Sequence, residues 1–248
     1  MSFEREYTGI MGSLAPPLLV VLLSATPAFA KPVECVILLH GLARTSHSMV
    51  PLEEALRRKG YVVANIDYPS RDHPIEILAP EAVERGLAAC RSCKAEVIHF
   101  VTHSLGGILV RQYLARNTVL ELGRVVMLAP PNQGSEVVDR FSKIPGYEAV
   151  NGPAGYQLGT GPESVPNMLG PVTYPVGVIA GTESVNLLLS SALPDPDDGK
   201  VSVARTRVEG MADFTTVDAS HPFIMRDVDA IRQVETFLAL GRFDYIQR

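Results

Sequence analysis

The sequence predicts an α/β fold, in which a mostly parallel sheet carries helices on both faces. Short apolar runs alternate with amphipathic stretches along the chain. Runs without polar alternation are typical of strands that are buried on both faces. The chain has 248 residues, of which 46% are hydrophobic, so a single domain can bury a large core. No internal repeat interrupts the alternation.

The first elements after residue 30 follow the order strand, helix, strand, helix. Val33–Leu39 is an apolar run with one charge, and Tyr61–Ile66 is a second strand-like run. Between them, Ser46–Lys59 places its apolar residues at helical spacing. Ile75–Ala89 repeats that spacing, with apolar residues three and four apart, and is also predicted to be a helix.

The same order continues through the rest of the chain. Val97–Val101 is a short apolar strand, and the amphipathic stretch Leu105–Arg116 predicts the helix that follows it. Val125–Leu128 and Val176–Ala180 are further buried strands. The apolar spacing of Ile224–Leu240 predicts a terminal amphipathic helix.

The segment from Pro145 to Pro175 breaks this pattern. Twelve of its 31 residues are Gly or Pro, and it has little periodicity. A long irregular connection in a compact domain is usually functional or disordered. We expect loops that lie near a functional site, with a passive surface insertion as the alternative.

The charge pattern excludes nucleic acid as a partner. The formal net charge is −5, and no run of Lys or Arg exceeds three residues. A nucleic-acid binder needs a basic face that neutralises phosphates. No Cys/His cluster has zinc-ligand spacing, and no clear calcium ligand set is present, so we expect neither a metal nor a cofactor.

Residues 1–30 are typical of a signal peptide. Leu14–Leu23 is uncharged and mostly apolar, and Ala28-Phe29-Ala30 has a small-x-small cleavage pattern. This predicts export, periplasmic or secreted, and a mature domain of residues 31–248. The alternative is a membrane anchor, because residues 7–30 are uncharged over a length that could cross a bilayer. That alternative would give membrane association through the N-terminus.

The three cysteines allow at most one intramolecular disulfide. Cys90 and Cys93 have redox-motif spacing, but they follow a predicted helix and precede a strand, which is not the context of a thioredoxin-like site. A structural disulfide or unreactive thiols are favoured. Three pairings among Cys35, Cys90 and Cys93 remain open.

The stretch from Ala95 to Arg116 contains the most informative motif. An apolar run leads into Thr102-His103-Ser104-Leu105-Gly106-Gly107, and an amphipathic stretch follows at once. A serine on a strained turn between a strand and a helix requires small neighbours where the two backbones approach. The pattern matches the nucleophile elbow G-x-S-x-G, with Thr102 at the first glycine position. Ser104 is therefore the candidate nucleophile.

With these residues the chain resembles the α/β-hydrolase fold and, within it, the bacterial lipases and esterases. The resemblance implies an oxyanion hole made of two backbone N–H groups. His40-Gly41-Leu42 is similar to the HG-x element of lipases, which implies Leu42 and Leu105 as the donors. His40 itself is interpreted as a turn residue. The loop Ala129–Ser135 is similar to the P-H-x-G-S loop of these lipases, with Asn132 in place of the histidine.

The resemblance also implies a triad in the order Ser, then Asp or Glu, then His. His221 is the only one of the six histidines that follows Ser104, and it stands just before the terminal helix. Asp198 directly precedes Gly199 in a match to the acid loop D-G-x-V. The other candidate acids are Asp197, Asp213 and Asp218.

These residues predict a serine hydrolase that cleaves a small-molecule or lipid ester through an acyl-enzyme. Ser104 would attack the carbonyl, His221 would act as the base and Asp198 would orient His221. The apolar residues Leu169 and Leu187–Leu189 favour an acyl-chain substrate. One alternative is an acyltransferase or thioesterase with the same triad. The other is a non-catalytic accessory protein on the hydrolase fold.

Overall fold

The structure is a computed structural model that describes residues 1–4, 6, 9, 31–185, 187–191, 193–194 and 196–245. The chain divides into two units, 1–31 and 32–248. Most of the predicted signal peptide or anchor lies outside the described residues. Within the described part of the chain, no helix is both long enough and apolar enough to cross a membrane.

Six parallel strands form one sheet in the order β2-β1-β3-β4-β5-β6. The strands are β1 (Glu34–Leu39), β2 (Val62–Ile66), β3 (Val97–His103), β4 (Leu122–Leu128), β5 (Val176–Gly181) and β6 (Asp213–Val217). The order reverses between β1 and β3, because β2 lies on one side of β1 and all later strands lie on the other. In open α/β sheets, ligands bind at the carboxyl ends of the strands beside such a reversal.

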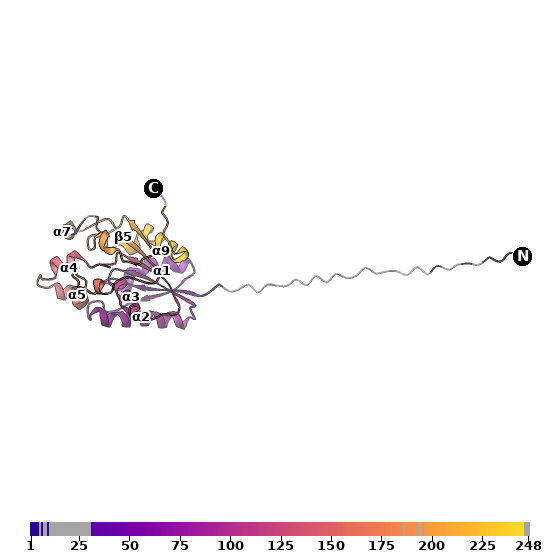
Figure 1. The fold of residues 1–248 in the computed structure, drawn as a ribbon, viewed down its shortest axis with the longest axis horizontal. Coiled ribbons are helices and arrows are strands. Elements are labelled where there is room, and N and C mark those ends of the chain that lie inside the picture. Colours follow the sequence, from indigo (N-terminus) through magenta and orange to yellow (C-terminus); the bar gives the residue numbers. More distant parts are fainter. Residues whose placement is uncertain are drawn as a thin grey trace. The chain divides into compact units, whose positions relative to one another are not determined.

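The described helices cover both faces of this sheet (Figure 1). The longer ones are α1 (Val50–Arg58), α2 (Ile75–Ser92), α3 (Leu105–Leu114), α5 (Tyr147–Tyr156) and α9 (Val228–Leu240). The shorter ones are η1 (Ser46–Met49), α4 (Glu136–Phe141), α6 (Val165–Met168), α7 (Leu187–Ser190), α8 (Val203–Thr206) and η2 (Ile224–Arg226). The predicted α/β architecture is confirmed, and every strand pair is parallel.

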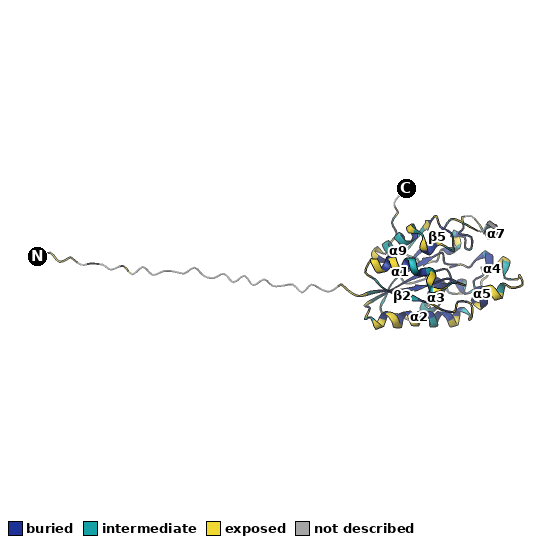
Figure 2. Cartoon of the chain, turned by 180° about the vertical axis from the view of Figure 1, so that it is seen from behind, coloured by how far each residue is buried: buried dark blue, intermediate teal, exposed yellow. Residues whose placement is uncertain are grey.

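Two apolar cores form because successive strand residues face opposite sides of the sheet. In β1, Ile37 packs in the core under α2 and α3, whereas Leu38 packs in the core under α1 and α9. The strands β1, β3 and β5 are almost fully buried, while the helices expose one side to solvent (Figure 2). This burial on both faces explains the continuous apolar runs in the sequence.

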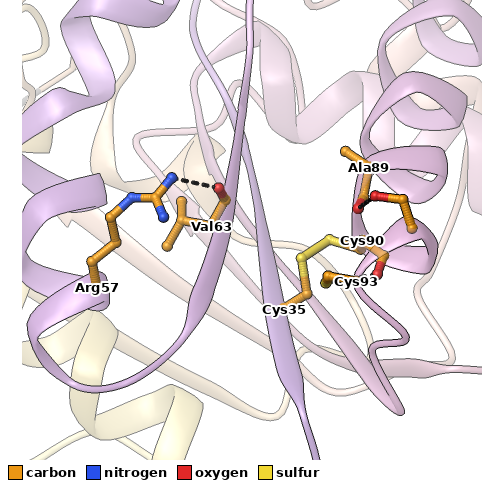
Figure 3. The surroundings of a disulfide bond; sticks show 7 residues. Cys35, Arg57, Val63, Ala89, Cys90 and Cys93 are labelled. Carbon is orange, nitrogen blue, oxygen red and sulfur yellow. Dashed lines mark hydrogen bonds between the residues drawn. A yellow bond between two sulfur atoms is a disulfide. The ribbon is translucent and has the colours of Figure 1, made fainter.

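A disulfide joins the first strand to the second long helix. Cys35 in β1 and Cys90 in the last turn of α2 are bonded, and Cys93 is free (Figure 3). The Cys93 thiol donates a hydrogen bond to the Cys90 carbonyl at 2.9 Å. Of the three pairings left open by the sequence, the one across 55 residues is formed.

The terminal helix begins later than the sequence predicts. Asp227 has extended backbone angles (φ −69°, ψ 136°), and its carboxylate accepts a hydrogen bond from the Ala230 N–H. This is an N-cap, so α9 starts at Val228 and Ile224–Arg226 is a separate 3₁₀ turn. The apolar spacing continues across the break because both pieces pack on the same core.

Several further elements, among them β6, α5 and α6, were not predicted from the sequence. The edge strand β6 has mixed polarity and is mostly half-exposed, so it lacks the apolar run of a central strand. Helices α5 and α6 lie in the segment 145–175, which was predicted to be loops. Gly152 (φ 62°) breaks α5 into two short helical pieces, which is why the sequence shows no helical periodicity there.

Candidate active site

The candidate nucleophile lies at the sharp turn between β3 and α3. Ser104 has φ 50° and ψ −118°. Residues other than glycine rarely adopt this backbone conformation, and it stores strain. The turn is held from below, since the Ser104 N–H donates to the Leu128 carbonyl at 2.9 Å. The hydroxyl is thereby presented at the carboxyl edge of the sheet, beside the strand-order reversal.

Gly106 allows the helix to start immediately after this serine. A Cβ at position 106 would lie 2.6 Å from the Leu39 carbonyl oxygen and 2.9 Å from the His40 carbonyl oxygen. Only glycine fits such an approach, because the obstructing atoms belong to the backbone. The close packing brings the start of α3 against the loop that follows β1.

The three residues of the expected triad form a continuous hydrogen-bonded series. His221 Nδ1 lies 2.7 Å from Asp198 Oδ2, and His221 Nε2 lies 3.0 Å from Ser104 Oγ. A carboxylate only accepts hydrogen bonds, so Nδ1–H donates to Asp198, and Nε2 is left to accept from the serine hydroxyl. That tautomer is the one in which His221 can remove the serine proton.

Several hydrogen bonds hold Asp198 in position. Its Oδ1 accepts the N–H groups of Lys200 and Val201 at 2.9 and 2.8 Å, and its carbonyl accepts the His221 N–H. The side chain is buried, with 1% of the residue exposed. Both carboxylate oxygens therefore have hydrogen-bond partners inside the protein.

The three rival acids bond elsewhere. Asp197 Oδ1 accepts from the Gly199 N–H and the Ser190 hydroxyl, both at 2.6 Å, which shapes the acid loop itself. Asp213 accepts from the Phe243 N–H, and Asp218 accepts from the Thr182 hydroxyl. Among the described residues, the structure brings only Asp198 to the His221 ring.

The two expected oxyanion donors belong to different elements, the start of α3 and the loop after β1. Leu105 is the first residue of α3, so its N–H has no partner four residues earlier within the helix. Leu42 lies in the loop after β1 and lines the same pocket as Ser104. That loop is fixed by two bonds, from the Ala43 N–H to Ser70 Oγ and from the Arg44 N–H to the Gly41 carbonyl.

His40 is buried and does not line the pocket at Ser104. Its ring stacks on Tyr68 with centroids 4.1 Å apart, and the Tyr68 hydroxyl donates to the His40 carbonyl at 2.5 Å. Burial lowers the pKa of His40, with smaller opposing effects from the Gly41 carbonyl and Asp67. These contacts agree with the interpretation of His40 as a turn residue.

Asn132 also acts inside the protein rather than in the pocket. Its Nδ2 donates to the Thr206 carbonyl at 2.8 Å, and its Oδ1 accepts from Arg111 at 3.1 Å. Arg111 is buried and also donates to three backbone carbonyl oxygens, those of Asn132, Pro166 and Gly170. Asn132 therefore links the loop after β4 to α3 and α8.

A second histidine contacts His221. His103 Nε2 donates to the His221 carbonyl at 3.0 Å, and the two rings lie 4.9 Å apart. Burial lowers the pKa of His103 well below its ordinary value, and the neighbouring His221 lowers it further. A ring that stays neutral can hold the His221 backbone without adding a charge beside the triad.

The pocket above Ser104 has a volume of about 370 Å³. Its apolar lining includes Val138, Tyr147, Val150, Leu158 and Leu189. A second, more open groove of about 510 Å³ continues from it and shares several of these residues. Residues of α5 line both, so the segment 145–175 borders the candidate site through helices.

The expected apolar residues divide between the pocket and the core. Leu189 lines both cavities, whereas Leu169 packs against the core beneath α2 and α3. The side chains of Leu187 and Leu188 lie outside the described part of the structure. Two cationic residues in the lining, Arg44 and Lys200, were not identified from the sequence. Each stands two positions after an expected site residue, a signal too weak to find them without the fold.

Comparison with known proteins adds the family. Residues 36–240 match the alpha/beta hydrolase family. Among proteins of curated function, none matches the sequence.

Solved structures resemble the chain in fold. Mature Bacillus licheniformis lipase BlEst2 has a TM-score of 0.65 at 20% identity, over 88% of this chain and 94% of its own. Phospholipase PlaB from Legionella pneumophila has a TM-score of 0.60 at 18% identity, over 85% and 58%. Pyrococcus furiosus esterase PF2001 has a TM-score of 0.58 at 21% identity, over 84% and 82%. At identities this low, the structural similarity establishes a shared fold alone.

Proposed function

The chain belongs to the alpha/beta hydrolase family, and from this premise we propose that it is a serine hydrolase that cleaves carboxylic esters. The observation that supports the proposal most directly is the series Asp198–His221–Ser104, with distances of 2.7 and 3.0 Å. A serine bonded to a histidine that is itself oriented by a carboxylate is the arrangement that activates a weak nucleophile.

In the proposed reaction, His221 Nε2 takes the Ser104 proton as Oγ attacks the ester carbonyl. Asp198 holds the imidazole in the required tautomer and stabilises its charged form. The N–H groups of Leu42 and Leu105 stabilise the oxyanion, and one such donor typically contributes about 3–4 kcal/mol to the transition state. His221 then protonates the leaving alcohol, and water hydrolyses the acyl-enzyme with His221 again acting as the base.

The proposed substrate has an apolar acyl chain. The apolar part of the pocket continues into the groove lined by Phe141, Ile144 and Val150. Both cavities have volumes in the range usual for small-molecule sites. The names of the structural neighbours, which include a lipase, an esterase and a phospholipase, agree with an ester substrate.

A fluorophosphonate probe tests the proposed nucleophile. We expect one adduct per chain, located on Ser104 by peptide mapping and absent from Ser104→Ala. The unlabelled protein should hydrolyse p-nitrophenyl esters and lose this activity on labelling, and an acyl-chain series from two to sixteen carbons would find the preferred length. A folded protein that takes up no probe and hydrolyses no activated ester would refute the proposal and leave the accessory-protein alternative.

We also propose that the protein is exported. The support that is independent of residues 1–30 is the disulfide between Cys35 and Cys90, since such bonds persist mainly in oxidising compartments. One structural neighbour is an extracellular alpha/beta-hydrolase from a Paenibacillus species. Intact mass of the protein purified with its own N-terminus should give a chain that begins at Lys31. A full-length chain retained in membranes would favour the anchor.

A further inference from the structure

The pocket beside Ser104 has a charge that the overall composition does not predict. The chain has a formal net charge of −5, yet two cationic side chains, Arg44 and Lys200, line the pocket. The only carboxylate in its described lining is Asp198, whose oxygens already bind His221 and two backbone N–H groups. The free charge in the described lining is therefore positive.

Both cationic residues lie in the loops that carry residues proposed for catalysis. Arg44 lies two positions after Leu42, in the turn closed by its own N–H and the Gly41 carbonyl. Lys200 lies two positions after Asp198, and its N–H donates to that carboxylate. The loop geometry that positions the oxyanion donor and the acid thus also brings a guanidinium and an ammonium to the same cavity.

Neither side chain forms an ion pair with any residue that the structure describes. Both residues are only partly exposed. Burial lowers the pKa of Lys200, Asp198 opposes this effect, and the charge of Arg44 lowers that pKa further. Holding two like charges near each other in a partly desolvated pocket is costly unless an anion joins them.

A further cavity beside the pocket also has cationic residues in its lining. A depression of about 510 Å³ adjoins the pocket and shares Ala43, Arg44 and Pro222 with it. Arg226 lies in this depression, with its guanidinium 4.0 Å from the centre of the Phe223 ring. No carboxylate is found among the described residues that line the depression. The pocket at Ser104 therefore adjoins two cavities, an apolar groove whose lining also includes Lys200 and a depression whose lining includes Arg44 and Arg226.

We propose that the substrate is an acyl ester whose alcohol half carries a phosphate, as in a glycerophospholipid, with Arg44 and Lys200 binding the phosphate. This inference rests on the proposed function. An apolar chain joined to an anionic alcohol matches a pocket whose lining is partly apolar and partly cationic, and arginine binds phosphate with paired N–H donors. Ser104 Oγ would bond to the acyl carbon as the ester C–O bond breaks. The proton from Ser104 would pass through His221 to the released alcohol, which keeps its phosphate.

A matched pair of soluble esters tests the inference. 1-Hexanoylglycerol 3-phosphate and 1-hexanoylglycerol share the acyl chain and the glycerol and differ only in the phosphate. We expect kcat/KM at least tenfold higher for the phosphate ester in dilute salt, and a smaller ratio at 0.5 M NaCl because exposed charges are screened. A ratio of one or below, with the neutral ester hydrolysed, would overturn the inference and leave the proposed function intact.

Variants assign the effect to the two cations. Arg44→Gln and Lys200→Gln should each lower the ratio of the two kcat/KM values about tenfold, whereas Arg44→Lys and Lys200→Arg should restore most of it. Arg116→Gln, which removes an exposed charge at the far end of α3, is the matched control and should leave the ratio unchanged. An unchanged ratio in both Gln variants would refute the assignment.

A binding measurement separates failure of the inference from failure of the proposed function. Calorimetry on Ser104→Ala with the two esters requires no turnover, and the phosphate ester should bind at least tenfold more tightly. Glycerol 3-phosphate and inorganic phosphate are further arms. If they bind as tightly as the ester, the site is one for free phosphate and the lipid assignment is wrong.

Discussion

At the scale of single residues, the backbone conformation of Ser104 decides the geometry of the site. A φ of 50° at a non-glycine residue costs about 1–3 kcal/mol, and the surrounding contacts must hold it. The Leu128 carbonyl below and the close approach of Gly106 to β1 supply that support. The strain aims the hydroxyl away from the sheet and towards His221.

Replacing Gly106 tests this support. In Gly106→Ala, the new Cβ would meet two backbone carbonyl oxygens, so we expect a loss of about 1–3 kcal/mol in the free energy of unfolding. Urea unfolding measures it. Gly161→Ala is the matched control, because no atom lies within 4 Å of that added Cβ, and we expect a change within about 0.5 kcal/mol. Equal effects of the two substitutions would contradict the role of the close approach.

Two adjacent aspartates give a second comparison at this scale. In Asp198→Asn, the amide cannot enforce the His221 tautomer, so kcat should fall on the order of 10⁴-fold. In Asp197→Asn, the amide oxygen can still accept from Gly199 and Ser190, and we expect a loss within about tenfold. Steady-state kinetics on one p-nitrophenyl ester distinguishes them. The reverse order of effects would assign the acid to Asp197.

At the scale of elements, covalent and polar links join parts that are distant in sequence. The disulfide connects β1 to the end of α2, and Arg111 in α3 donates to carbonyl groups of the loop after β4 and of the segment around α6. These links stabilise the core beneath α2 and α3, and the turn at Ser104 packs against this core. The α5 segment, by contrast, contributes mainly to the cavity lining.

Removing the disulfide should destabilise the domain without changing the fold. It closes a 55-residue separation, and loss of that constraint on the unfolded chain costs about 2–4 kcal/mol. Urea unfolding of Cys35→Ala/Cys90→Ala should show this loss. Cys93→Ser is the control and should retain the sensitivity of the native protein to reductant. If reductant destabilised the double variant equally, the disulfide would not be the source.

At the scale of the whole molecule, charge is distributed unevenly. The chain is acidic overall, yet positive groups gather beside Ser104, and three histidines are enclosed in or near the two cores. Burial is the largest effect on His40, His99 and His103, and it lowers the pKa of each. All three are therefore neutral inside the folded domain near pH 7.

These histidines predict how stability depends on pH. In the unfolded chain each binds a proton near pH 6.5, whereas in the folded domain binding requires a lower pH. Their contribution to the free energy of unfolding is fully present above pH 6.5. It is lost as the pH falls from 6.5 towards the pKa values of the folded state. The loss reaches at most about 1.4 kcal/mol per pH unit for each histidine.

Urea unfolding at pH 7.5, 6.5 and 5.5 measures this dependence. His99→Gln should reduce the slope by up to one proton, since it removes one of the three groups. A free energy of unfolding that stays constant between pH 7.5 and 5.5 would mean that the folded and unfolded states bind equal numbers of protons, which would contradict the lowered pKa values of the buried histidines.

The sequence by itself determined five of the six strands, the long helices other than α5, and the residue types at the candidate site. Continuous apolar runs and helical spacing are local properties, so they can be recognised along the sequence alone. The elbow motif around Ser104 is local as well. Sequence reasoning missed β6, because the polar residues of this edge strand form no apolar run. It also missed α5, because helical periodicity is interrupted at Gly152.

Only the tertiary structure decided which distant residues meet. It selected Asp198 from adjacent aspartates, Cys90 rather than Cys93 as the partner of Cys35, and Arg44 with Lys200 as joint lining of one pocket. Each choice depends on how parallel strands bring their carboxyl ends to one edge and how a helix packs across them. Spacing along the chain contains no record of that arrangement, because it results from burying two apolar faces at once.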